Sequence, residues 1–113
     1  MAVPRRLGRP AGVRLDTVRA APELVAAIGD WLGWLAEGRR LSPHTVSAYR
    51  RDVTIFCDFL GRHFGGLPGL SDLARLRPAD VRAFLAARRS DGRAGVTLAR
   101  ALSALRSLFG YLE

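Results

Sequence analysis

The sequence predicts an all-α protein, a compact four-helix bundle with an orthogonal arrangement. Along four segments, apolar residues recur at steps of three and four, which is the spacing of one face of a helix. No stretch shows the alternation of apolar and polar residues that is typical of a half-buried strand. The 113 residues, 49% of them hydrophobic, suffice for one core but not for two ordinary domains. We therefore expect one folded unit over residues 22–113, preceded by a tail.

The first 21 residues are expected to form a flexible basic tail. They hold five arginines, two prolines and two glycines without apolar periodicity. The first helix is predicted to start beyond Pro22 and to end at Gly38, which would serve as its C-terminal cap. Its apolar face consists of Leu24, Ile28, Trp31 and Leu35. Residues 22–38 contain three acids and no basic residue, so this is the acidic helix of the chain.

The second helix begins at Ser42-Pro43, a side-chain cap followed by proline at the first helical position, and runs to about Arg62. Its predicted apolar stripe is Val46, Tyr49, Val53, Phe56 and Leu60. The opposite, polar face carries His44, Ser47, Arg51, Thr54 and Asp58. The glycines and the proline between residues 61 and 69 predict a loop after this helix.

The third and fourth helices complete the predicted bundle. A short turn through residues 70–76 leads to the third helix, which starts at Pro78, ends near residues 90–92 and buries Val81, Phe84 and Leu85. The fourth helix runs from about Val96 to Leu112, with a predicted buried stripe of Leu98, Leu102, Leu105, Phe109 and Leu112. Its other side carries Thr97, Arg100, Ser103, Ala104 and Ser107. One arginine among small side chains allows close approach to another surface.

The charge of the chain favours a polyanionic partner. The net charge is +8 and all 18 basic residues are arginine, which pairs with phosphate through a bidentate fork. Nucleic acid is the first expectation and an anionic membrane the second. No stretch resembles a membrane span or a secretory leader, so we expect a cytoplasmic protein. The single Cys57 has no partners at metal-ligand spacing, so no metal, disulfide or cofactor is expected.

Two blocks of sequence carry a family signature. The first is LSPHTVSAYRRD over residues 41–52, and the second is DVRAFLAARR over residues 80–89 followed by LARALSALRSLF over residues 98–109. Over residues 23–113 the chain resembles the N-terminal core-binding domain of tyrosine recombinases, the Xer type in particular. The resemblance implies a SAM-like bundle that forms half of a C-shaped clamp around a recombination site. It also implies that the second and fourth helices face the major grooves and the first lies away from DNA.

The resemblance further implies a catalytic domain, and its residue set is not recognisable here. That set includes a lysine, a His-x-x-Arg pair and a tyrosine nucleophile. The chain has no lysine, and neither His44 nor His63 is followed by arginine at the third position. Tyr49 falls on a predicted buried stripe, and Tyr111 falls at a helix end. We therefore expect a DNA-binding fragment that does not cut DNA, with the catalytic domain absent from this chain.

The predicted DNA-binding residues lie on or beside the second and fourth helices. They are His44, Thr45, Ser47, Arg50, Arg51, Arg93, Thr97, Arg100, Ser103 and Ala104. Small hydrogen-bonding groups in the first turns suit a helix that enters a groove by its N-terminal end. Arg50, Arg93 and residues 39–40 suit phosphate contacts, and Thr45 suits the cap or the edge of the interface. Because Arg100 is expected opposite the buried stripe, its removal is expected to cost little stability.

The predicted function is to grip duplex DNA for a Xer-type recombinase in chromosome dimer resolution, beside other recombinase protomers. One alternative is the equivalent domain of a phage or transposon integrase. Another is a helical protein-interaction module that uses the acidic first helix. A peripheral membrane binder would need arginines flanking exposed aromatics on an amphipathic helix, which the sequence lacks. No small-molecule substrate is expected.

Overall fold

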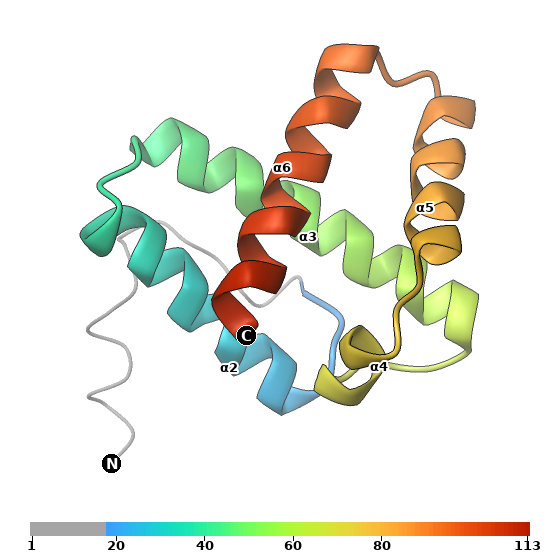
Figure 1. Cartoon of the computed structure of the whole chain (residues 1–113), viewed down its shortest axis with the longest axis horizontal. Coiled ribbons are helices and arrows are strands. Elements are labelled where there is room, and N and C mark those ends of the chain that lie inside the picture. Colours follow the sequence, from blue (N-terminus) through green and yellow to red (C-terminus); the bar gives the residue numbers. More distant parts are fainter. Residues whose placement is uncertain (1–17) are drawn as a thin grey trace.

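The computed structural model describes residues 18–113, so most of the predicted tail, residues 1–17, lies outside the described residues. The elements are α2 (Pro22–Gly33), the π-helical segment η1 (Trp34–Gly38), α3 (Pro43–Phe64), α4 (Leu70–Ala74), α5 (Pro78–Ser90) and α6 (Gly95–Leu112). No strand occurs between residues 18 and 113, which confirms the all-helical prediction. None of the helices in this part of the chain is long and apolar enough to cross a membrane. Figure 1 shows α6 crossing α3, with α5 beside α6 and α2 below.

The predicted first helix is one continuous rod that changes its hydrogen bonding after Gly33. Its last turn, η1, is wider than an α-helical turn, and the Arg39 amide donates to the Trp34 carbonyl at 2.9 Å. A Cβ at position 38 would lie 2.8 Å from Cδ1 of Trp34, so any other residue there would force the indole to shift. The predicted apolar face is confirmed, since its four residues are all buried. Trp34 instead lies at the surface and packs against Tyr111, with ring centroids 5.2 Å apart.

The start of α3 is the one that the sequence predicts. Ser42 has extended backbone angles and its hydroxyl accepts a hydrogen bond from the Thr45 amide at 3.1 Å. The helix ends at Phe64, where Gly65 adopts a left-handed φ of 82° that glycine tolerates without strain. Four of the five predicted stripe residues are buried, and Tyr49 is half-buried against Trp31. The apolar periodicity therefore placed the buried face of α3 correctly.

The buried face of α6 is rotated from the predicted one. Its buried residues are Leu98, Ala101, Ala104, Leu105 and Leu108. Leu102, Phe109 and Leu112 are half-buried at the flank of this face. The predicted stripe contains only large side chains, but α6 turns two alanines inward as it packs across α3 and α2. Ala104, predicted to contact DNA, is completely buried and lies in the core.

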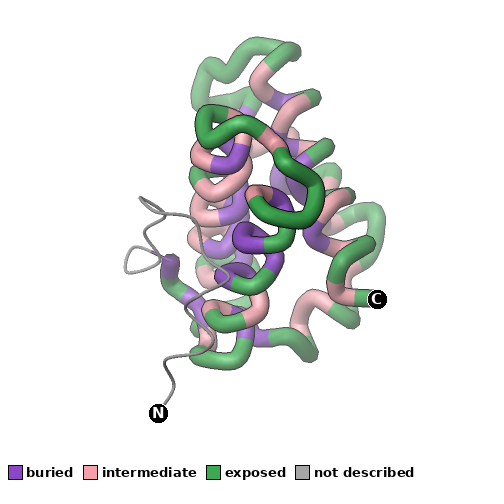
Figure 2. Tube along the Cα trace, turned by 90° about the vertical axis from the view of Figure 1, so that its left-hand side faces the viewer, coloured by how far each residue is buried: buried purple, intermediate pink, exposed green. Residues whose placement is uncertain are grey.

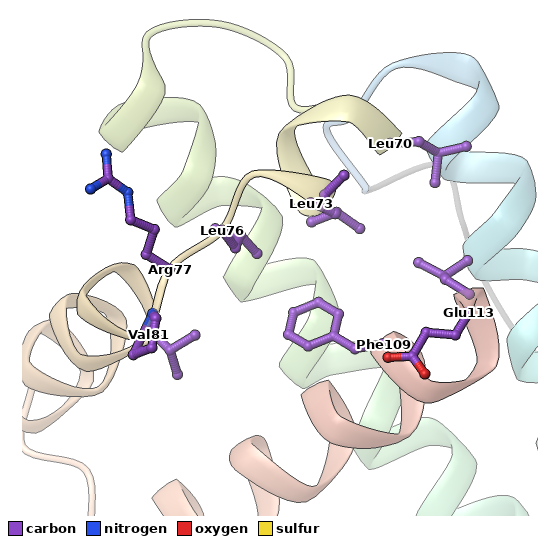
Figure 3. Close-up of a pocket in the computed structure, with 10 residues that line it drawn as sticks. Leu70, Leu73, Leu76, Arg77, Val81, Phe109 and Glu113 are labelled. Carbon is purple, nitrogen blue, oxygen red and sulfur yellow. The ribbon is translucent and has the colours of Figure 1, made fainter.

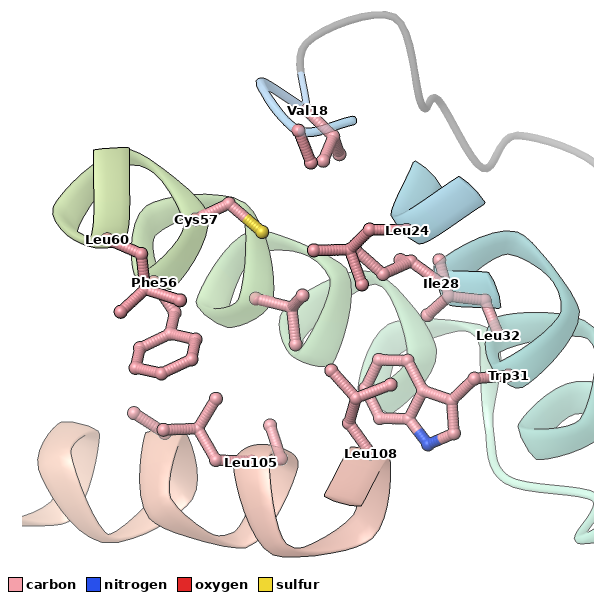
Figure 4. Close-up of a cluster of buried hydrophobic side chains, with 14 of the residues drawn as sticks. Val18, Leu24, Ile28, Trp31, Leu32, Phe56, Cys57, Leu60, Leu105 and Leu108 are labelled. Carbon is pink, nitrogen blue, oxygen red and sulfur yellow. The ribbon is translucent and has the colours of Figure 1, made fainter. Parts of the chain in front are cut away.

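The core lies where α2, α3 and α6 meet, with Phe84 of α5 packed edge-on to Phe56 at 5.0 Å between ring centroids. Figure 4 shows side chains from α2, α3 and α6 converging there, and Figure 2 shows buried segments on the inner sides of the helices. Val18 and Ala20 belong to this core, and the Ala21 amide donates to the Pro68 carbonyl at 2.8 Å. The packed part of the chain thus reaches back to Val18, before the predicted boundary at residue 22.

An apolar groove of about 680 Å³ opens between α4, the start of α5 and the end of α6. Its apolar lining includes Leu70, Leu73, Leu76, Val81, Phe109 and Leu112. Arg77 and Glu113 are the charged residues that line it (Figure 3). The groove involves the C-terminal end of α6, whereas the predicted DNA-binding residues of this helix lie between Thr97 and Ala104.

Candidate DNA-binding surface

The first turns of α3 present polar side chains to solvent. His44 is exposed, and Ser47 lies one turn further along the same face. Thr45 is tied to the helix cap, because the Ser42 hydroxyl donates to its Oγ1 at 3.0 Å. The sequence predicts Thr45 in the cap or at the edge of the interface, and its position in the cap is confirmed.

Arg51 and Arg50 extend this surface along α3. Arg51 is exposed, and its Nη1 donates to Ser47 Oγ at 3.2 Å, so the two side chains form one polar ridge. Arg50 is half-buried on the flank, and its carbonyl accepts a hydrogen bond from the Thr54 hydroxyl at 2.8 Å. An exposed arginine beside a hydroxyl supplies the kind of donors that DNA phosphates and base edges accept.

The crossing of α3 and α6 is held by an ion pair that the sequence argument missed. Asp52 of α3 is 1% exposed, and Arg100 of α6 donates to its Oδ2 from Nε at 2.9 Å and to its Oδ1 from Nη2 at 2.8 Å. These hydrogen bonds raise the pKa of Arg100 above its usual range. Arg100, predicted on the solvent-facing side of α6, is thus 39% exposed but also packs against α3 through this pair. The prediction that its loss costs little stability leaves out the buried carboxylate that would lose its cation.

A signal for this pair was present in the sequence. At 100° per residue Asp52 falls only about 40° from Phe56, at the edge of the apolar stripe of α3. A carboxylate at such a position is desolvated and needs a cation or several hydrogen-bond donors. An arginine on the neighbouring helix was the obvious partner, but periodicity alone does not say which arginine faces it.

The remaining predicted residues of α6 divide between the surface and the interior. Ser103 is exposed and Thr97 is half-buried, whereas Ala104 is in the core and is removed from the candidate surface. Ser107, on the same predicted polar side, accepts a hydrogen bond from Nε1 of Trp31 at 3.0 Å and so serves packing. Arg93 is exposed in the turn that precedes α6. The structure thus brings the α3 residues together and leaves a smaller polar surface on α6 than predicted.

The approach to α3 carries two further arginines. Arg39 lies over the Trp34 ring at 5.5 Å, and Arg40 has a left-handed φ of 57° that non-glycine residues seldom adopt. The turn they make lets the Leu41 amide donate to the Leu35 carbonyl at 2.9 Å, which directs the chain into the cap of α3. Both arginines are exposed and close in sequence to the α3 N-terminus. No group of three or more potential metal ligands gathers anywhere in residues 18–113.

Comparison with known proteins identifies the family. Residues 28–113 match the model of the phage integrase N-terminal SAM-like domain. The chain is 55% identical over 96 residues to the tyrosine recombinase XerC of Mesorhizobium japonicum, which covers 85% of this chain and 31% of that protein. It is 49% identical over 107 residues to XerC of Rhizobium meliloti, covering 93% of this chain and 34% of that protein.

The chain therefore spans about a third of the length of the curated relatives it matches. No solved structure matches it. The match to the family model covers most of the described helices, including all of α3, α5 and α6. The chain belongs to the phage integrase N-terminal SAM-like domain family, and it is similar to part of the XerC-type tyrosine recombinases.

Proposed function

We propose that this domain binds duplex DNA with the outer faces of α3 and α6 and is the DNA-gripping part of a Xer-type tyrosine recombinase. One observation carries the proposal: neither helix has a fully exposed carboxylate, whereas Arg51 stands exposed on α3. Asp52 is buried against Arg100, Asp58 is half-buried, and α6 contains no acid. Phosphates are repelled by carboxylates and attracted by arginine, so a surface with few exposed acids and an exposed arginine suits a duplex backbone.

The individual roles follow from position and exposure. His44, Ser47 and Arg51 stand on the first turns of α3 and would reach base edges when that end of the helix enters a major groove. Thr97, Arg100 and Ser103 would face the duplex from α6, with Thr45 at the edge of the contact. Arg50 and Arg93 would bind phosphates. The acidic α2, whose Glu23 and Asp30 are exposed, would lie away from the DNA.

The proposal extends to the longer protein. The helices would form the four-helix, orthogonal SAM-like bundle that makes one half of a clamp, with a catalytic domain outside this chain closing the other half. Strand exchange by transesterification through a tyrosine would need neither metal nor nucleotide. We further propose that the longer protein acts in chromosome dimer resolution in the cytoplasm with other recombinase protomers. Its similarity to XerC-type tyrosine recombinases supports this, and the equivalent domain of a phage or transposon integrase is the alternative.

A titration of the 113-residue chain against labelled random duplex tests this proposal. Fluorescence anisotropy at several salt concentrations should give a log-log slope of roughly −4 to −5, as expected for about five phosphate contacts. A duplex carrying a chromosome-dimer-resolution site should bind more tightly at the same salt. A flat salt response would reject DNA binding and favour the protein-interaction alternative.

Two arginine variants then test which face binds. Arg51→Ala removes a charge from the proposed surface, and Arg82→Ala removes the same charge from the exposed side of α5. Arg51→Ala should weaken binding about tenfold, whereas Arg82→Ala should cause only the small loss expected from long-range electrostatics. Equal losses in two folded variants would mean that another face contacts the DNA.

A further inference from the structure

Among residues 18–113, Asp52 is the buried carboxylate. DNA binding by the exposed faces of α3 and α6 does not by itself explain why an acid is buried between the two helices. Among residues 18–113 the buried charged residues are Asp52 and Arg88. A desolvated carboxylate costs free energy even when it is paired, and apolar replacements for buried ion pairs are often neutral or stabilising. The pair with Arg100 therefore needs an explanation other than maximal stability.

The geometry of the pair leaves one edge of the guanidinium free for a ligand. Arg100 uses Nε and Nη2 for Asp52, at 2.9 and 2.8 Å, and its side chain remains 39% exposed. The Nη1 group and the second Nη2 hydrogen form another planar fork of donors. Such a fork matches two phosphate oxygens, or O6 and N7 of a guanine.

The buried partner also holds that fork in place. A free arginine side chain samples many rotamers and loses that freedom when it binds. Arg100 is anchored by two hydrogen bonds to a carboxylate on the neighbouring helix, so its guanidinium is already ordered at the α3–α6 crossing. Arg51, the residue before Asp52 on α3, is exposed on the proposed DNA-binding surface.

We propose that Asp52 is a positioning residue for DNA binding: it holds the Arg100 guanidinium so that its outer edge meets a pair of acceptor atoms on the duplex. This inference rests on the proposed function, because it needs DNA at the outer face of α3 and α6. Asp52 itself contacts no DNA. Its effect on binding passes through Arg100.

The sign of one substitution separates this role from general electrostatics. Asp52→Asn preserves shape but removes a negative charge, and general electrostatics alone would then strengthen binding to a polyanion. A loss of positioning instead weakens binding, and we expect about a three- to tenfold rise in Kd. Asp91→Asn is the charge-matched control, because Asp91 is exposed in the turn between α5 and α6. That variant should bind as tightly as the parent or slightly more tightly.

Two further variants test whether Asp52 acts through Arg100. Arg100→Lys keeps the charge but lacks the planar fork, so its Kd should rise by a similar factor. In an Arg100→Gln background, Asp52→Asn should change the Kd by less than about twofold, because the group that Asp52 positions is gone. All Kd values are measured by anisotropy at one salt concentration, below the melting temperatures found by circular dichroism.

The outcomes distinguish the two proposals. If the parent chain does not bind duplex DNA, the proposed function fails. If the parent binds and a folded Asp52→Asn variant binds at least as tightly, the positioning role alone is overturned. The same conclusion follows if Asp52→Asn weakens binding equally with and without Arg100. Should Asp52→Asn not fold, parent-like binding by Arg100→Lys overturns the role.

Duplexes that differ in sequence identify the acceptor. If the fork meets a base edge, Arg100→Lys should remove the preference for one base pair. If it meets a phosphate, Arg100→Lys should weaken binding to all sequences by the same factor. Either result supports the positioning role, because both require an ordered guanidinium at the DNA surface.

Discussion

The indole Nε1 of Trp31 in α2 donates a hydrogen bond of 3.0 Å to the hydroxyl of Ser107 in α6. Trp31 is completely buried, so its single polar atom depends on this partner. The bond ties the acidic helix to the last helix of the domain. It also explains why a serine stands on the inward side of α6.

Replacing Ser107 by alanine should therefore lower the free energy of unfolding by about 1 kcal/mol, because it leaves the buried indole N–H without a partner. Urea denaturation followed by tryptophan fluorescence measures the change. Ser103→Ala on the exposed side of α6 is the matched control and should stay within about 0.5 kcal/mol of the parent. Equal effects of the two substitutions would show that the Trp31 bond contributes nothing.

Arg100→Ala should destabilise the domain by about 2 to 3 kcal/mol, because it leaves the Asp52 carboxylate buried without its cation. Thermal and urea unfolding by circular dichroism give the loss. Arg82→Ala removes an exposed arginine from α5 and should change stability by less than about 0.5 kcal/mol. A parent-like Arg100→Ala variant would contradict the ion pair at the helix crossing.

The hydrogen bonds of the Asp80 carboxylate should stabilise the fold, and this stabilisation should disappear in acid. The Arg77 amide donates to Asp80 Oδ2 at 2.9 Å and the His63 ring lies 2.9 Å from Oδ1; these hydrogen bonds lower the pKa of Asp80 below its ordinary 3.8. Because the pKa of Asp80 is lower in the folded than in the unfolded protein, its charged form stabilises the fold at pH values above the unfolded pKa. This stabilisation is lost as the pH falls through the folded pKa.

Asp80→Asn should accordingly be less stable than the parent at pH 7, and the difference should shrink below about pH 4. Urea titrations of both proteins at a series of pH values measure it. A difference that is constant from pH 7 to pH 2 would mean that the negative charge of Asp80 is not what stabilises the start of α5.

Cys57 should be inert in the folded domain. Burial, with a smaller effect of Asp58, raises the pKa of its thiol to about 12, and the thiolate is the reactive form. A chromogenic disulfide reagent at pH 8 should label the native protein far more slowly than the urea-unfolded chain. Complete labelling within the mixing time under native conditions would contradict the buried position of Cys57.

The chain alone should form no covalent adduct with a nicked suicide substrate. Tyr49 stacks at 11° on the buried Trp31 ring, and Tyr111 packs against Trp34, so both tyrosine rings serve packing. Denaturing gel electrophoresis after incubation with labelled duplex would reveal an adduct. Its appearance would require a nucleophile that neither the sequence nor the packing of these tyrosines indicates.

Local patterns in the sequence predict the four longer helices and most of the core, whereas the short helix α4 lies where a turn is predicted. Apolar periodicity, the Ser42-Pro43 cap and the glycines after Phe64 placed α3 correctly, because local backbone preferences and one buried face decide these features. The family resemblance to recombinases also followed from local blocks of residues. These signals require no knowledge of which helix lies against which.

The rotation of α6 and the partner of each polar side chain depend on how the helices pack against one another. Ala104 and Arg100 were both expected on the outer face, yet one lies in the core and the other pairs with Asp52. A helix such as α6, which has small residues on several of its sides, can pack against its neighbours through more than one side. Its orientation then depends on what its neighbours offer, here the Asp52 carboxylate and the Trp31 indole, and a single-helix pattern does not contain that information.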